Sequence, residues 1–570
     1  MILLRTILAF LISVNVVFLL FANYSTRRIT TTTTTNFEPS HTKYAFKDPV
    51  LAYQILKKLD ILQPEYNVTF TKVRPYYGII PDDHYCDKHR AYFVNYPGYV
   101  FTEKNHITSF SSSGGFRKTV LGAMGKNVMP EVRSRNVEYL DKNPRELAVD
   151  ISLFAMGGES YYYLSVMKQF SCLGQMANHI PGHDNLHRKD MACRSLVEYA
   201  KQYQTRPQCF NLDKFFPKTY SMKIREECED FFNEFNSPKY HELKKKRDII
   251  YFRKIGAHAH VAEGVYPVND NEEKYIRELY QNGRLCGKIK ENNLMQYYVH
   301  NPLLLYGKKF DFRLYMLIAS TNPFIVYYHD GLLRVSLTPY DTKGNVTKSL
   351  MPNGRVNDEM IYAARDAGTY MGMTAEELTD QYMWTFERLR DYLYERSIIT
   401  DPNWLDNYLR PQLKVAMVHL MRMSQRDFFK ISSVFELFGL DFMLDEEMNL
   451  WFIEGNCKPA IESLNDKWTK FFADMFREHY EIAIALLRSR MKRIYHYVNN
   501  LIITEQVIRV SEQDVHILNY EQRLREFKEI SKNYFDPEFE ITQPNGFVKI
   551  IDENYQGAKR YLGFLPEECL

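Results

Sequence analysis

The stretch that most constrains the fold lies between Phe435 and Pro459, where two apolar runs flank a short charged segment. The first run contains Asp441, and the second ends in Glu454 and Asn456. Two such runs separated by a polar turn are typical of a β-hairpin, and pairing of its strands would bring the three side chains to one end of a sheet. Two carboxylates and an amide offer only oxygen ligands, which suit Mg²⁺ better than zinc. The sequence therefore predicts a magnesium site here, with an ordinary acidic hairpin as the alternative.

The size and composition of the chain describe a globular protein of several parts. Its 570 residues exceed one simple core and predict roughly two to four structural units. A net charge of +3 with 25% charged residues excludes a generally basic nucleic-acid binder, so no nucleic-acid partner is expected. The 42 tyrosines and 37 phenylalanines fit a well-packed interior and argue against extensive disorder.

The N-terminal segment differs from the rest of the chain. No residue from Thr6 to Thr26 is charged, and most of residues 7–22 are apolar. An apolar span of that length crosses a bilayer as a helix, so we expect a membrane anchor; a cleaved signal peptide is the alternative. Basic residues lie on both sides of the span, so its orientation stays open between a cytosolic and a luminal catalytic domain.

The cysteines leave the compartment open. Eight cysteines are scattered at wide spacings, without a paired zinc motif. Their even number, with glycosylation sequons at Asn67 and Asn345, would permit a luminal domain with disulfides. Thiols in a cytosolic domain fit the same sequence equally well.

Apolar periodicity and turn residues predict a mixture of helices and strands. Strands are expected at residues 248–255, 294–299, 312–320 and 324–329, helices at 374–396, 412–437 and 467–501, and an extended tyrosine-rich stretch at 95–104.

Three charged residues, Lys309, Asp311 and Arg313, alternate with phenylalanines at the start of one predicted strand. Alternation places the three on one face of that strand. Buried charges are costly unless they meet a ligand or one another. Arg334, two positions before Ser336 on the next strand, has the fork geometry that suits a carboxylate substrate. A ligand site and a structural network of ion pairs both fit this pattern.

Several sequence blocks occur in the order found in the tubulin tyrosine ligase-like family, which the chain resembles over about residues 90–490. The blocks are NYPGYVFTEK, FFPKTY, FRKI, QYYV, NPLLLYGKKFDFRLYMLIAS, LLRVSLTPY, FELFGLDFML and FIEGN. The resemblance implies an α/β (α+β) fold of the ATP-grasp type, with a family-specific N-terminal region and a helical C-terminal extension.

The resemblance also implies a role for each matching residue, with Lys254, Arg313 and Arg334 as the catalytic ones. It places Lys254 at the phosphates of ATP, and it places the adenine among Gln296, Tyr297, Tyr298 and Val299. The nucleotide would also be bound by Lys309, Asp311 and Asn353, with Arg313 close by. The carboxylate of the incoming amino acid would meet Arg334 and Ser336, and Mg²⁺ would be bound by Asp441, Glu454 and Asn456.

The reaction implied by the resemblance joins an amino acid to a protein carboxylate through an acyl phosphate, using ATP and Mg²⁺. Glutamate is the commonest amino acid in the wider family, so tubulin polyglutamylation is expected, with tubulin or microtubules and free glutamate as partners. Two alternatives stay open. One is a pseudoenzyme that docks on microtubules through the basic cluster from Arg488 to Arg493; the other is a luminal ligase with a non-tubulin acidic substrate.

The chain departs from the family pattern at the loop over the phosphates. The segment reads HVAEGV from His260 to Val265, where Val261 replaces an arginine and Glu263 adds a negative charge. Glycine lets a backbone approach phosphate closely, and only Gly264 is kept. A second block is reduced to SLMPN. We therefore expect weak nucleotide affinity.

The expected domain organisation follows from these features. It comprises an anchor at 1–28, a threonine-rich tether at 29–45, the N-terminal region at 46–240, the ATP-grasp core at 241–490 and a C-terminal extension at 491–570.

Overall fold

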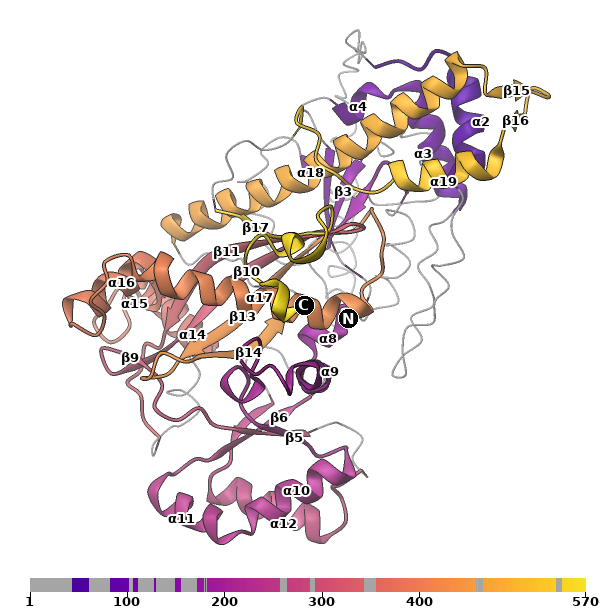
Figure 1. Cartoon of the computed structure of the whole chain (residues 1–570). Helices are drawn as coiled ribbons and strands as arrows, with labels where there is room; N and C mark the ends of the chain where they lie inside the picture. The colour runs from indigo at the N-terminus through magenta and orange to yellow at the C-terminus, as the bar shows by residue number, and fades with distance from the viewer. Residues whose placement is uncertain are drawn as a thin grey trace, which may run out of the picture. The chain divides into compact units, whose positions relative to one another are not determined.

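The computed structural model describes most of the chain beyond its first 43 residues. The described residues are 44–60, 83–101, 106–110, 128–129, 149–154, 172–178, 180, 182–256, 264–287, 293–342, 355–457, 459, 465–539 and 546–570. Residues Phe46 to Leu570 form one compact unit. The predicted mixed α/β class is confirmed, since antiparallel sheets and many helices share this unit (Figure 1).

A large antiparallel sheet forms the centre of the molecule. Its strands follow the order β12-β11-β10-β13-β14, with β17 paired to β11 and β9 paired to β10. The strands are β9 (Leu304–Leu305), β10 (Lys308–Thr321), β11 (Phe324–Val335), β12 (Met383–Trp384), β13 (Glu436–Leu444), β14 (Leu450–Asn456) and β17 (Val548–Asp552). The strands expected at 312–320 and 324–329 are confirmed within β10 and β11. β13 and β14 form the predicted hairpin.

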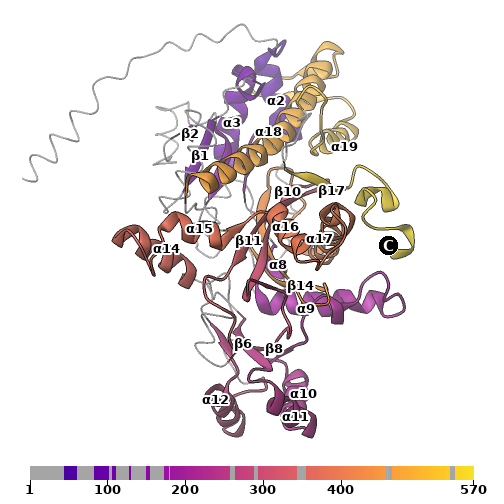
Figure 2. The same cartoon turned by 90° about the vertical axis from the view of Figure 1, so that its left-hand side faces the viewer.

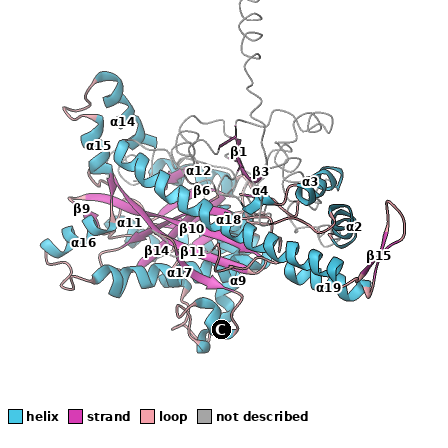
Figure 3. Cartoon of the chain, turned by 90° about the horizontal axis from the view of Figure 1, so that it is seen from above, coloured by secondary structure: helices cyan, strands magenta, loops and turns pink. Residues whose placement is uncertain are grey.

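Helices cover both faces of this sheet because its central strand β10 is apolar on both. Phe312 contacts Phe386 of α16 (Phe386–Glu395), with ring centroids 5.4 Å apart. Tyr315 points to the opposite face and meets Phe472 of α18 (Asp466–Ile503) at 6.2 Å. Figures 1 and 3 show α18 running along the sheet. The face with Phe312 belongs to the main apolar core, which α17 (Arg410–Ser424) and α9 (Lys189–Ala200) complete.

A smaller antiparallel sheet carries its own helical layer. Its strand order is β5-β8-β6-β7, and Figure 2 shows its helices on the side away from the large sheet. The elements are β5 (Thr219–Ser221), β6 (Tyr251–Ile255), β7 (Val265–Pro267), β8 (Asn293–Tyr297), α10 (Arg225–Phe235), α11 (Pro238–Lys246) and α12 (Asp270–Gln281). Phe231, Phe235 and Ile276 of these helices pack with Tyr251 and Met295 in a separate apolar core.

The remaining described elements flank these two sheets. A parallel sheet has the order β2-β1-β3-β4, and β15 pairs with β16 in a short hairpin. The elements are α2 (Pro49–Leu59), α3 (Asp83–Asn95), α4 (Gly98–Phe101), β1 (His106–Phe110), β2 (Val128–Met129), β3 (Val149–Phe154), β4 (Met176–Ala177), α8 (Asp184–His187), α14 (Arg355–Ala367), α15 (Ala375–Tyr382), β15 (Val507–Arg509), β16 (Val515–Ile517) and α19 (Tyr520–Ile530).

Three local predictions are corrected by tertiary pairing. The helix expected at 374–396 is two helices, because Met383 and Trp384 between them form β12 and pair with β11. The helix expected at 412–437 ends at Ser424, and Glu436 and Leu437 already belong to β13. The stretch at 95–104 contains the helical turn α4 instead of an extended segment.

Six of the eight cysteines form disulfides: Cys86–Cys172, Cys209–Cys569 and Cys228–Cys286. Cys193 and Cys457 keep their thiols in buried positions. Of the two alternatives left by the sequence, the pairing matches a domain with disulfides.

The prediction of a single-pass membrane protein is corrected. Among the residues that the structure describes, no helix combines the length and the apolar character needed to span a bilayer. The anchor expected within residues 7–22, and the sequons at Asn67 and Asn345, lie outside the described residues. The predicted domain boundaries stay predictions; α18 runs continuously through residue 490.

Candidate functional site

The hairpin of β13 and β14 brings its polar residues to one face. Asp441 lies directly opposite Glu454, and Asn456 lies opposite Gly439. Directly opposite residues share a face of an antiparallel pair, as do residues two apart on one strand. The predicted gathering of Asp441, Glu454 and Asn456 at one end of the sheet is therefore observed, and their role as magnesium ligands stays a prediction.

Asp441 is bound by two arginines from the neighbouring strands. Arg313 donates to both of its carboxylate oxygens, with Nε at 2.6 Å and Nη2 at 3.0 Å. Nη2 of Arg334 lies 2.9 Å from Oδ2 of Asp441 and also donates to Asp311 at 2.7 Å, beside Nε at 2.8 Å. We call these four residues the ion-pair network. Their contacts match the network of ion pairs that the sequence left open.

The electrostatics of the ion-pair network follow from burial and mutual charge. All four side chains are at most 11% exposed. Burial alone would raise the pKa of Asp441, but the charges and hydrogen bonds of Arg313 and Arg334 outweigh it and lower the pKa to about 2. Burial, with the charge of Asp441 beside it, raises the pKa of Asp311 despite Arg334. Two cations and two anions thus offset one another.

Two lysines lie near this network: Lys309 is buried, and Lys254 is partly buried. Burial lowers the pKa of Lys254 to about 8, an effect that Glu454 opposes and Lys189 reinforces. Burial lowers the pKa of Lys309 to about 7 against the attraction of Asp311, and Lys254 adds to the lowering. Nζ of Lys309 lies 4.9 Å from the centre of the Tyr298 ring. Both lysines would regain charge beside an anionic ligand.

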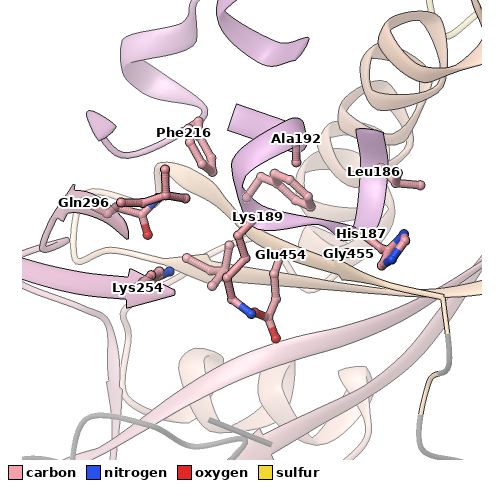
Figure 4. Close-up of a pocket in the computed structure, with 12 residues that line it drawn as sticks. Leu186, His187, Lys189, Ala192, Phe216, Lys254, Gln296, Glu454 and Gly455 are labelled. Carbon is pink, nitrogen blue, oxygen red and sulfur yellow. The ribbon is translucent and has the colours of Figure 1, made fainter. Parts of the chain in front are cut away.

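A small pocket opens between the two sheets beside Lys254. In Figure 4, Lys254 and Gln296 come from the smaller sheet, while Glu454 and Lys189 point toward each other. Lys189 makes an ion pair of 3.2 Å with Glu454. The full lining is Leu186, His187, Lys189, Ala192, Phe216, Lys254, Leu294, Gln296, Phe452, Ile453, Glu454 and Gly455. Its apolar walls carry two ammonium groups and one carboxylate, a charge pattern that suits the binding of an anionic group.

Of the four residues expected around adenine, one lines the pocket and three lie outside its lining. Gln296 lines the pocket, and its amide donates to the hydroxyl of Thr219 at 2.9 Å. Tyr297 accepts a hydrogen bond from Arg247, and the hydroxyl of Tyr298 meets that of Tyr340 at 2.9 Å. Val299 follows them and is buried.

The other predicted positions lie around the ion-pair network or beyond the described chain. Ser336 is buried, and its hydroxyl lies 3.1 Å from that of Thr338. Asn353 and residues 257–263 of the phosphate loop lie outside the described residues. Gly264 has a φ of +73°, a conformation that glycine adopts without strain.

The donor set fits a magnesium ion in part. Glu454 and Asn456 offer the hard oxygen atoms that Mg²⁺ prefers, and Glu454 lines the pocket. Both oxygens of Asp441 already accept hydrogen bonds from guanidinium groups. Glu454 and Asn456 are therefore the better-placed ligands of the three.

The basic cluster from Arg488 to Arg493 is mostly used inside the protein, which corrects the expectation of a docking patch. Arg490 is 1% exposed and donates to backbone carbonyls of Ser432, Leu173 and Gln175. Lys492 pairs with Asp536 and Glu538.

Sequence reasoning missed two features of the site. Lys189, the partner of Glu454, lies in no motif and gives no local signal. His183, His187 and Cys457 gather beside the pocket. The spacing of the two histidines in HDNLH, four residues apart, was the signal for part of this cluster.

The comparison with known families matches this architecture. A model of the "Tubulin-tyrosine ligase family" matches residues 167–494, more than half of the chain. The chain belongs to this family. The predicted ATP-grasp-type α/β fold is thereby confirmed.

Individual relatives are distant and carry different names. Rat "Protein polyglycylase TTLL10" is 25% identical over 288 residues, which cover 47% of this chain and 38% of that protein. Human "Inactive polyglycylase TTLL10" is 24% identical over 48% of this chain and 40% of its own length. A "Probable beta-tubulin polyglutamylase" of Tetrahymena thermophila is 26% identical over 51% of this chain and 22% of its own. The match thus spans two fifths or less of these relatives, and the polyglutamylase branch stays a prediction.

Proposed function

We propose that this chain is an ATP-dependent carbon–nitrogen ligase that joins an amino acid to a glutamate side chain of an acidic polypeptide. The supporting observation is the pocket between the sheets, where Lys254, Lys189 and Glu454 converge beside the ion-pair network. Family membership supports the same reaction class.

The proposed reaction has two steps, phosphorylation of the acceptor and formation of the amide bond. A carboxylate oxygen of the acceptor attacks the γ-phosphorus of ATP, and ADP leaves. The amine of the incoming amino acid then attacks the acyl carbon, inorganic phosphate leaves, and the nitrogen loses a proton. Lys254 and Lys309 hold the phosphates and offset their charge during the first step. Arg334, fixed by Asp311 and Asp441, orients the carboxylate of the amino acid.

Glu454 and Asn456 would hold Mg²⁺ at the phosphates. A magnesium ion there supplies charge stabilisation to the transferring phosphoryl group. Lys189 keeps the Glu454 carboxylate in place at 3.2 Å. Burial alone would raise the pKa of Glu454, but Lys189 and Lys254 lower it, so the carboxylate stays ionised as a ligand.

Glycine is our proposed amino acid, in place of the glutamate expected from the wider family. Two of the three relatives described above carry the name polyglycylase, and they align with 47% and 48% of this chain. The named polyglutamylase supports glutamate as the second choice.

A transfer assay tests the ligase. The full chain is incubated with ATP, Mg²⁺, an acidic acceptor such as polyglutamate or tubulin, and labelled glycine or glutamate in parallel. We expect ATP-dependent incorporation by the wild type and a loss of at least about tenfold in Glu454→Gln, because a metal ligand is weakened. Equal labelling by wild type and Glu454→Gln contradicts the proposal.

A binding protein without transfer activity is the second candidate. It is favoured by the engagement of both Asp441 oxygens with arginines, and by the printed name of the human relative. ATP binding without transfer of either amino acid to either acceptor supports this candidate. Transfer excludes it.

We also propose that the acceptor lies in an oxidising compartment. Three disulfides among eight cysteines are the supporting observation, because disulfides persist in secretory and extracellular spaces and are rare in reducing ones. Non-reducing peptide mapping of chain purified from its native cells tests this. Native Cys209–Cys569 and Cys228–Cys286 bridges are expected, and blocked-thiol mapping that finds all eight cysteines reduced in the cell contradicts it.

A further inference from the structure

A cluster of metal-ligating side chains lies where α8 meets the end of β14, outside the proposed reaction. His183 precedes α8, His187 is its last residue, and Cys457 directly follows β14. One ligand atom from each of the three lies within 4.8 Å of the other two. Two imidazoles and a thiol therefore converge from two distant parts of the sequence.

The backbone explains this convergence. His183 and His187 are one helical turn apart, so they lie on one side of α8, with ring centroids 4.7 Å apart. β14 approaches this turn closely at Gly455. A Cβ atom there would lie 2.7 Å from the carbonyl oxygen of Leu186, so only glycine permits the approach that places Cys457 beside the histidines.

Hydrogen bonds hold both imidazole rings through Nδ1, which leaves Nε2 of each ring as the atom that can bind a metal. Nδ1 of His183 lies 2.7 Å from Oε2 of Glu436, which also accepts from the backbone N–H of Ile180 at 2.9 Å. Nδ1 of His187 lies 3.3 Å from the carbonyl oxygen of His183. A carboxylate and a carbonyl only accept, so both Nδ1 atoms donate, and each imidazole that gives up any proton on Nε2 can bind a metal through the lone pair of that atom.

This orientation is the one that metal-binding histidines show in proteins, with the second nitrogen held by a carboxylate or carbonyl. We propose that His183, His187 and Cys457 bind a zinc ion. Nitrogen and thiolate ligands select zinc over magnesium, and zinc accepts three protein ligands with a fourth position for water or another side chain.

The geometry needs only small side-chain movements to bind the ion. Metal–ligand bonds of about 2.0–2.3 Å place tetrahedral ligand atoms about 3.5 Å apart, somewhat closer than the 4.8 Å limit observed. Asp184 is not part of the cluster, although its Oδ1 lies 3.9 Å from Nε2 of His187, so the fourth position is left to water.

A bound zinc ion would connect two elements that border the pocket, α8 and the end of β14. His187 lines the pocket, and Cys457 follows three residues after Glu454. Zinc bound here fixes α8 to the strand end that carries Glu454 and Asn456. This is a positioning role, and it is independent of whether the chain transfers an amino acid.

Metal analysis of the full chain tests the site. The chain is secreted from an oxidising compartment so that its disulfides form, then equilibrated with zinc and passed over a chelating resin. We expect about one zinc per chain in the wild type and a loss to background in Cys457→Ser and His187→Gln. Cys193→Ser is the matched control, because Cys193 is the other buried thiol, and it should keep its zinc.

Cobalt substitution supplies a readout that does not depend on stability or activity. Thiolate ligation gives a sulfur-to-cobalt charge-transfer band in the wild type and in Cys193→Ser, absent in Cys457→Ser. Zinc at about a hundredfold excess over its Kd should raise the Tm of the wild type by about 2 °C, since it binds only the folded chain.

Four results overturn the proposal. The first three are a wild type without retained zinc, retained zinc that is equal in Cys457→Ser and wild type, and cobalt spectra without a sulfur band. Rapid alkylation of the Cys457 thiol in the zinc-saturated wild type also overturns it, and indicates a thiol nucleophile with His183 as its base.

Discussion

The large sheet and the pocket beside it both bury charged side chains, but the charges are balanced in different ways. In the sheet, Arg313 and Arg334 bind Asp441 and Asp311, and each charge has an opposite charge within 3.0 Å. In the pocket, burial lowers the pKa of Lys254 to about 8. The network is complete without a ligand, whereas the pocket gains most from an anion. The network therefore holds Arg334 in place, and the pocket supplies the positive charges that an anionic nucleotide would meet.

The largest effect is expected from breaking the ion-pair network. Asp441→Ala leaves two guanidinium groups with one buried carboxylate, Asp311, between them. The free energy of unfolding should fall by about 3–5 kcal/mol, because an uncompensated buried charge remains. Urea unfolding followed by circular dichroism measures this. A loss below about 1 kcal/mol would show that the network is not buried as described.

Removing the pocket lysine should affect binding and spare stability. Lys254→Met is expected to weaken ATP binding about 10- to 100-fold, as expected for the loss of a hydrogen bond to a charged group. Its stability should stay equal or rise, since a partly buried ammonium is removed. Calorimetric titration with ATP measures the affinity. Lys239→Met, at an exposed lysine of the same region, is the control, and an equal loss there would contradict a specific role.

The affinity for ATP should depend on pH, because the pocket lysines titrate near neutrality. The pKa values of about 8 for Lys254 and about 7 for Lys309 mean that both lose charge as pH rises from 6 to 9. Phosphate favours the charged form, so ATP binding takes up protons, and affinity should fall by up to about tenfold per pH unit for each proton taken up. Titrations at pH 8 in buffers of different ionisation enthalpy measure the uptake. Proton release instead of uptake would contradict the assignment.

The smallest effect is expected at an exposed ion pair. Glu198 and Lys201 lie 2.8 Å apart with side chains 55% and 59% exposed. Glu198→Gln should leave the free energy of unfolding unchanged within the error of the measurement, because solvent screens the pair. The urea assay used for Asp441→Ala provides the direct comparison. A loss of unfolding free energy as large as that of Asp441→Ala would show that burial does not explain the difference between the two ion pairs.

Three features could be predicted from the residues alone: the hairpin of β13 and β14, the alternation of charges along β10 and the family. Each depends on local periodicity or on the order of motifs, which one chain carries in its residues. Asp441 opposite Glu454 follows directly from two runs and a tight turn.

The partners that these residues contact follow from the tertiary structure and not from their neighbours in the sequence. Whether Asp441 meets a metal or two arginines could not be predicted from the residues around it, because Arg313 and Arg334 are more than 100 residues away. The division of one expected helix by β12 depends on pairing with β11, and the disulfides and the His183–His187–Cys457 cluster depend on chain packing. Neighbours across long loops are set by the packing of apolar faces, and that packing leaves no local signal in the residues it brings together.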